Sequence, residues 1–250
     1  MARKTDDGLI LQGDVFVRNR RIEGSGLVHI GNTTKMELSA SVETKERISK
    51  QKESFGQALD SLSTPQPTTI NFELDTFDRH NLALALMGVD ADLSRPAGDF
   101  SRDVVIHKKG QFFSIGETGL DTAEAITVTC NGNALDTAAF VINHALGLIQ
   151  IAANSSAVND GDTVTVAGKV KAQNGFTINA SKINDWDLEI LLDGKNRVDG
   201  KDYKLSIPSA VIAADGAIDW FGDDFAKAAF TGKLVKVAGE DAPYYLTVAE

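Results

Sequence analysis

The chain has 250 residues, of which 42% are hydrophobic and 24% charged, so it is long and apolar enough to bury a sizeable core. Its net charge of −10 argues against stable binding to nucleic acid or to anionic lipid, both of which favour a basic surface. A single cysteine, Cys130, excludes an intrachain disulfide framework, and no run approaches the ~18 apolar residues that span a bilayer.

Alternation of apolar and polar residues predicts strands along most of the chain, beginning with residues 13–22. Residues 33–42 and 68–74 alternate most clearly, which is the pattern of half-buried strands. Gly, Asn and Asp separate the later strands, as hairpin turns require. These are expected at 103–107, 111–115, 126–130, 139–142, 148–151, 162–167, 186–192, 203–212, 233–238 and 244–249. We therefore predict a mainly-β fold.

A long link, residues 43–66, separates the strands at 33–42 and 68–74. Structureless loops of this length are uncommon inside a compact domain and are usually functional or mobile. Weak alternation continues through the link, which favours an extended hairpin arm; a solvated, mobile loop is the alternative. In the first part of the link, four basic residues outnumber the acids Glu46 and Glu53. These four bases and two apolar residues are the candidate contact residues: Lys45, Arg47, Lys50, Lys52, Ile48 and Phe55.

One α-helix is predicted at residues 77–87, after a cap at Asp75 or Thr76 and before a stop at Gly88. Its apolar residues form two stripes, which predicts burial on two sides. The packing residues are expected to include Phe77, Leu82, Leu84 and Leu86. A second helix is predicted at 222–230, with Phe225 turned inward.

Residues 117–175 form a β segment that is rich in Ala, Asn and Thr. It is either an insertion into a domain made of residues 1–116 and 176–250, or part of one continuous sheet. Residues 185–224 hold ten acidic and four basic residues, a charge of −6. Their last four aspartates could meet a cation, although a solvated acidic face is the simpler interpretation: Asp215, Asp219, Asp223 and Asp224.

Motifs of catalysis are missing from the sequence. It contains no nucleophile elbow, no phosphate-binding loop and no dinucleotide fingerprint, and its four histidines lack the spacing of a metal site. We therefore expect no enzyme, no cofactor and no metal, although a hydrolase whose site is assembled only in space is an alternative.

Four stretches carry a resemblance to a known family. They are the Gly31-Asn32 strand with its following arm, the strand at 69–77 that leads into Asn81-Leu82-Ala83-Leu84-Ala85-Leu86-Met87-Gly88, and the later strands at 188–196 and 203–208. In this layout the chain resembles the major tail-tube proteins of long-tailed bacteriophages. The resemblance covers about residues 25–90 and 185–250.

The resemblance implies a β-sandwich or partly closed barrel flanked by one helix. It also implies rings, usually of six subunits, that stack into a hollow tail tube through which DNA passes during infection. The expected location is the virion tail, assembled in the host cytoplasm, and the expected partners are other copies and other tail proteins. An acidic wall would let DNA pass without tight binding.

The arm is the part of the chain that we expect to make the ring-to-ring contact, landing on the acidic residues 185–224 of the next ring. A different class of function stays open, a β-rich binding or adhesin module displayed on a surface. Such a module would share the strands but would not polymerise alone into tubes.

Overall fold

A computed structural model describes residues 8–249 of the chain. Strands hold 53% of the residues and helix 4%, so the predicted mainly-β fold is confirmed. None of the described sheets closes into a barrel, and their arrangement is compatible with the predicted β-sandwich. The chain divides into two compact units: the first ends at Asp90 and resumes at Ile178, and the second spans Ala91–Thr177.

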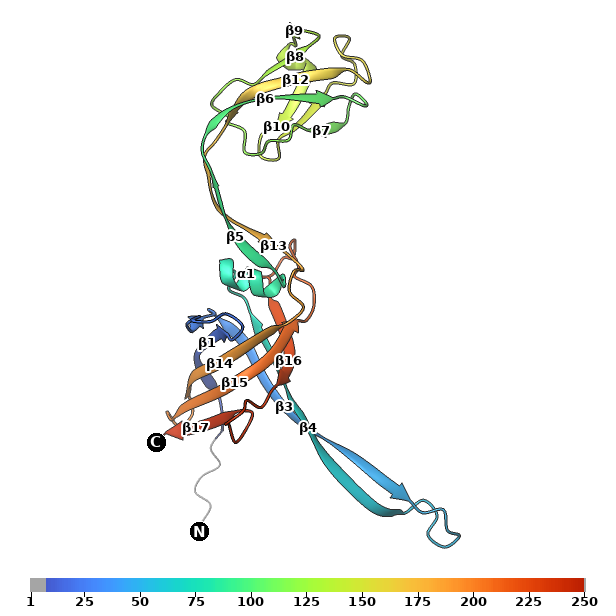
Figure 1. Ribbon diagram of the computed structural model, residues 1–250, viewed down its shortest axis with the longest axis vertical. Coiled ribbons are helices and arrows are strands. Elements are labelled where there is room, and N and C mark those ends of the chain that lie inside the picture. Colours follow the sequence, from blue (N-terminus) through green and yellow to red (C-terminus); the bar gives the residue numbers. More distant parts are fainter. Residues whose placement is uncertain (1–7, 250) are drawn as a thin grey trace. The chain divides into compact units, whose positions relative to one another are not determined.

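The first unit is built on an eight-stranded antiparallel sheet (Figure 1). Its order is β2-β1-β14-β15-β16-β4-β3, and β15 pairs along its first half with β17 and along its second half with β16. The strands are β1 (Leu11–Asn19), β2 (Val28–His29), β3 (Thr33–Ile48), β4 (Ala58–Leu74), β14 (Trp186–Asn196), β15 (Asp202–Ala214), β16 (Ala228–Leu234) and β17 (Tyr245–Ala249).

The core of this unit follows from the alternation of its strands. In β4 Ile70, Phe72 and Leu74 are buried, and Phe72 stacks on Phe230 of β16 with ring centroids 4.8 Å apart. Each such side chain contributes about 1.5–3 kcal/mol on burial. The C-terminal part of β4 is therefore fixed in the core, while its N-terminal part continues outward into the arm.

The arm, residues 43–66, is a two-stranded ribbon that extends from the sheet (Figure 1). Its pairing runs from Glu43↔Thr64 to Ile48↔Ala58. The partner of β4 on its other side, β16, pairs only with residues 69–74. The predicted extended hairpin is therefore present, and nothing flanks it on either edge within residues 8–249.

Arg79–Ala85 form α1, the one α-helix of residues 8–249, which is shorter than the predicted 77–87. Asp78 is its N-cap, because the Asp78 side chain accepts a hydrogen bond from the backbone N–H of Asn81 at 2.7 Å. At its end Met87 takes a left-handed conformation, and the N–H of Gly88 donates to the carbonyl of Ala83 at 2.9 Å.

The predicted caps Asp75 and Thr76 have a different role. Thr76 Oγ1 accepts the backbone N–H of Asn32 at 2.9 Å, and the Asp75 carboxylate accepts from Asn32 Nδ2. Gly31 has φ 75°, and a side chain there would collide with Thr76. These residues join the start of β3 to the end of β4, so they hold the base of the hairpin.

The predicted helix at 222–230 is wrong. Residues 222–227 lie in the loop between β15 and β16, and Ala228 begins β16. The strand hydrogen-bonds to β15 on one side and to β4 on the other, and this pairing outweighs a weak local helix signal. Phe225, predicted to face inward, is exposed.

The second unit is a separate sandwich of two small sheets with orders β6-β12-β8-β9 and β10-β11-β7. Their inner faces share a core of Val, Ile, Leu and Phe residues together with Cys130. The elements are β6 (Gly98–Val105), β7 (Phe112–Ser114), β8 (Thr127–Cys130), β9 (Asn133–Ala134), the 3₁₀ turn η1 (Thr137–Ala139), β10 (Phe140–Asn143), β11 (Leu148–Ile151) and β12 (Thr163–Val170).

A two-stranded ribbon leads into and out of this second unit. It consists of β5 (Val89–Arg95) paired with β13 (Gln173–Asn179). The unit starts at Ala91, earlier than the segment 117–175 indicated by sequence, because β6 and β7 pair with β12 and β11. Residues 91–116 thus belong to the second unit and not to the first.

Candidate assembly interface

The candidate contact residues of the arm lie along the ribbon and at its tip. Ile48 is exposed at the end of β3, and Phe55 in the tip is 75% exposed. None of the arm's side chains belongs to either hydrophobic core. An isolated two-stranded hairpin is only marginally stable in water. The arm therefore leaves apolar surface uncovered in the single chain.

The tip, residues 49–57, is a hydrogen-bonded turn. The N–H of Ser49 donates to the carbonyl of Gln57 at 2.7 Å, and the N–H of Gly56 donates to the carbonyl of Ser49 at 3.0 Å. The buried Ser49 hydroxyl also bonds to that of Ser54 at 2.7 Å. These bonds give the tip a defined shape that presents Phe55 outward.

The arm as a whole is not basic, contrary to the sequence interpretation. Its four bases are balanced by four acids, Glu43, Glu46, Glu53 and Asp60, so 4 − 4 gives zero. Asp60 is far from Arg47 in sequence but opposite it in register, and the two form an ion pair at 2.6 Å. Lys45 lies 3.7 Å from Glu43.

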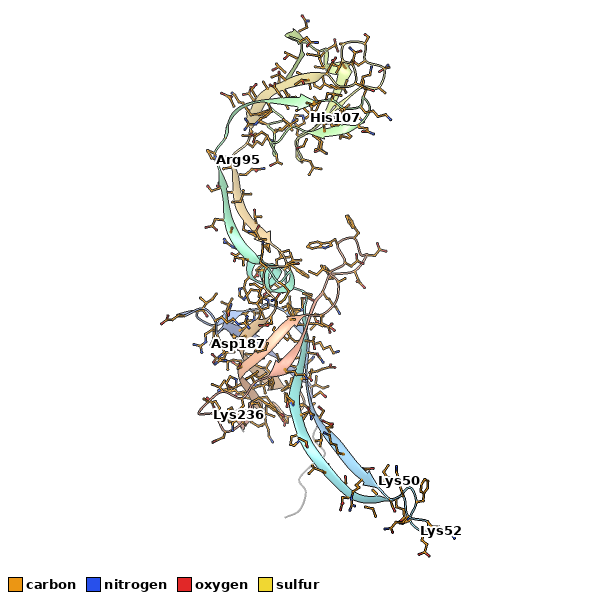
Figure 2. The ribbon with its side chains drawn as sticks, turned by 45° about the vertical axis from the view of Figure 1, so that its right-hand side comes forward. Lys50, Lys52, Arg95, His107, Asp187 and Lys236 are labelled. Carbon is orange, nitrogen blue, oxygen red and sulfur yellow. The ribbon has the colours of Figure 1, made fainter. Side chains whose placement is uncertain are left out.

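Lys50 and Lys52 are the bases that stay available for a partner. Both are exposed at the tip, where Figure 2 shows them at the end of the ribbon. No carboxylate in the described part of the chain lies within ion-pair distance of either ammonium group. The basic character expected of the arm is thus confined to its tip.

The acidic segment 185–224 divides into two parts. At the start of β14 and just before it, three acids form ion pairs with arginines of β1 and the turn after it: Asp185 with Arg21, Asp187 with Arg20 and Glu189 with Arg18. These pairs neutralise three of the acids in the first part. The four last aspartates, which lie in the loop between β15 and β16, are exposed and have no basic partner among residues 8–249.

The same loop carries aromatic residues that sequence reasoning missed. Residues 215–227, here called the aromatic loop, expose 64% of Trp220, 97% of Phe221 and 90% of Phe225. The run Trp-Phe-Gly-Asp-Asp-Phe was a usable signal, because large aromatic residues between turn-forming residues cannot follow a strand or helix period. The aromatic run was overlooked because the predicted helix at 222–230 placed Phe225 on a buried face.

The four helix residues expected to pack are brought together in part. Leu84 is buried in the core of the first unit, and Phe77 packs against that core with partial burial. Leu82 and Leu86 are half-buried and do not belong to the core cluster. Trp186 Nε1 donates to the Leu84 carbonyl at 3.3 Å and so fixes the helix to β14.

A cavity of about 510 Å³ lies beside α1 in the first unit. It is lined mainly by apolar side chains, with His80 and the Arg21–Asp185 ion pair among the polar ones. Burial lowers the pKa of His80 below its ordinary value, while Asp78 and Asp90 act in the opposite direction. His80 Nε2 is buried and makes no hydrogen bond within residues 8–249.

Metal ligands do not gather in the described residues: no three His, Cys, Asp or Glu side chains there are placed to hold an ion. The aspartates of the aromatic loop are included in this finding. No helix within residues 8–249 has the length and apolar character needed to cross a membrane.

A comparison with protein families places the chain. A family model described as "Protein of unknown function UCP028589" matches residues 9–242. The chain belongs to this family. No curated protein matches it. The stretch matched to the UCP028589 family includes the arm, the inserted unit and the aromatic loop.

Proposed function

We propose that the chain is a structural subunit that assembles with copies of itself into rings, which stack into a hollow phage tail tube for the passage of DNA. The observation that carries the proposal is the arm. A ribbon that leaves the sheet and exposes apolar residues gains little stability inside one chain. Contact with another copy would bury the apolar side chains that the arm exposes in the single chain.

Reach supports a contact beyond the chain's own sheet. The part of β4 that lies in the arm, residues 58–66, spans roughly 30 Å at about 3.3 Å per residue. Such a length is comparable to the size of a small domain. The arm can therefore bridge to the next ring while the sheet stays within its own.

The anchoring of β3 and β4 in the sheet, at the end away from the arm, supports a rigid contact. Asn32, Asp75 and Thr76 join β3 to β4 by three hydrogen bonds, and the buried C-terminal part of β4 continues directly into the ribbon. A ribbon fixed in this way transmits its direction from the core to the tip. Successive rings held by such arms keep a constant orientation.

The test is a chain whose arm is removed at its base. Residues 42–65 are replaced by Asn-Gly, so that the paired residues Ser41 and Gln66 flank a two-residue turn. We expect the variant to keep the melting temperature of the wild type, because the arm contributes nothing to the core. In sedimentation velocity the variant should form no species larger than single rings.

The wild-type chain measured at the same concentrations is the control and should form long stacks. A variant that stacks into tubes as long as those of the wild type would contradict the role of the arm. A variant that fails to fold would show that the arm supports the sheet, which the absence of arm residues from the core argues against.

A second candidate function is display of a binding module, favoured by the second unit. This unit has its own two sheets and its own core, and a two-stranded ribbon connects it to the rest. Under this function the full chain stays monomeric at every concentration and binds a cell-surface target. Binding should then vanish when residues 91–177 are replaced by a short turn.

A further inference from the structure

The aromatic loop exposes three large aromatic side chains in the first unit. Trp220, Phe221 and Phe225 are each more than 60% exposed, and four exposed aspartates lie between and before them. Soluble monomers rarely expose a contiguous patch of this kind unless it binds something. Asp219 accepts the N–H of Phe221 at 3.0 Å, which sets the direction of the loop where the aromatic residues begin.

The area of the three aromatic side chains is close to what a stable interface needs. A Phe or Trp buries about 150–250 Å² in an interface, so three give roughly 450–750 Å². A standard protein–protein interface buries about 800 Å² per partner. The aromatic loop can therefore supply most of one side of an interface.

Charge identifies the partner as the arm tip of another copy. The loop, residues 215–227, has four aspartates and Lys227, so its charge is 1 − 4 = −3. The tip, residues 49–57, has two lysines and Glu53, so its charge is 2 − 1 = +1. The tip also presents Phe55 for contact with aromatic rings, and lysines bind favourably over the face of Trp.

The two patches lie at opposite ends of the same strand. Ala228, directly after the aromatic loop, pairs with Leu74 of β4, and Lys233 pairs with Thr69. The loop therefore lies at the α1 end of β4, and the arm leaves from the other end (Figure 1). One chain cannot bring the two together, whereas two chains arranged head to tail can.

We propose that the aromatic loop of one copy receives the arm tip of the copy in the neighbouring ring. The inference rests on the proposed function and names the surface that the arm contacts. A contact between two different patches is heterologous, and such a contact repeats from copy to copy as an open stack when its rotation does not close into a ring. Stacking of rings along an axis requires this property.

Charge reversal tests the pairing. The tip variant carries Lys50→Glu and Lys52→Glu, the loop variant carries Asp223→Lys and Asp224→Lys, and a third chain carries all four changes. All four residues are exposed, so each chain should fold. We expect each double variant to raise the concentration needed for tube growth by about tenfold or more, since like charges then face each other. The chain with all four changes should grow tubes again, because opposite charges face each other once more.

A matched control reverses two exposed lysines outside both patches, Lys108→Glu and Lys236→Glu. It changes the net charge as the tip variant does and should form tubes at the wild-type concentration. A four-fold variant as defective as the double variants would overturn the pairing, while wild-type tubes would leave the proposed function standing. Absence of tubes from the wild type would contradict the proposed function and this inference together.

Fluorescence gives a second measurement that does not depend on tube length. The chain has two tryptophans, and Trp186→Phe leaves the exposed Trp220 as the only tryptophan, which can be excited selectively over the three tyrosines. Its emission should shift to shorter wavelength when tubes form, and the tip variant should show no shift at the same concentration. Emission that stays at the solvent-exposed wavelength in fully formed tubes would contradict burial of the loop.

Discussion

At the scale of single residues, we expect His80 to make the stability of the first unit depend on pH. Burial lowers its pKa below about 6.5, the ordinary value, more than Asp78 and Asp90 raise it. As the pH falls below 6.5 the unfolded chain binds a proton that the folded chain binds less readily. The free energy of unfolding therefore falls as the pH is lowered from 7 toward 5.

The corresponding variant is His80→Gln, which cannot bind this proton. We expect its free energy of unfolding, measured in denaturant at several pH values, to decrease less between pH 7 and pH 5 than that of the wild type. Equal decreases in the two chains would show that His80 is not responsible. Replacement of the surface residue His107 by Gln is the control.

The sequence predicted the burial of single residues where the pattern lies within one strand. Alternation predicted a half-buried strand at residues 68–74, and Ile70, Phe72 and Leu74 are its buried face. The partner of Arg47 was out of reach, because Asp60 lies opposite it only after the hairpin has formed. Charges that look uncompensated along the sequence can be compensated across a strand pair.

At the scale of elements, α1 has one side that the core requires and one side that it does not. Leu84 is 2% exposed, and Leu82 is half-buried and outside the core cluster. We expect Leu84→Ala to lower the free energy of unfolding by about 2–5 kcal/mol. Leu82→Ala should cost clearly less, as measured by denaturant unfolding of each chain.

The comparison is matched, because the same side chain is removed from neighbouring positions of one helix. Equal losses for the two variants would mean that both sides of α1 are packed in the single chain. The expectation of two buried stripes came from helical periodicity, which marks apolar faces but does not say whether the same chain covers them.

The elements that sequence reasoning missed have two different physical causes. β5 and β13 form a ribbon that is exposed on both faces, so neither strand has a buried row that would produce alternation. The strand β16 was predicted at residues 233–238, later than its observed position, for another reason. Its pairing on both sides depends on distant strands, and the local sequence before it favoured a helix.

At the scale of the whole molecule, the two cores should be separable. The second unit has its own hydrophobic cluster and is entered and left through one ribbon. Replacing residues 91–177 by a short Gly-Ser turn should leave the first unit folded and able to assemble. Circular dichroism and sedimentation would check this, and loss of assembly in a well-folded variant would give the second unit a part in the contact.

DNA should pass through the assembled tube without being held. The net charge of −10 opposes adsorption of phosphate, so duplex DNA should not be retained at physiological salt. A gel-shift experiment with single chains and with assembled material checks the expectation. Tight binding that weakens with salt would contradict a passive conduit and make Lys50 and Lys52 candidates for DNA contact.

Self-assembly is the central claim, and electron microscopy of the purified wild-type protein at rising concentration tests it most directly. We predict rings at low concentration and hollow tubes of one uniform diameter at high concentration, because every chain carries both an arm and an aromatic loop. A chain that stays monomeric at every concentration and salt, with neither rings nor tubes in the images, would contradict the account.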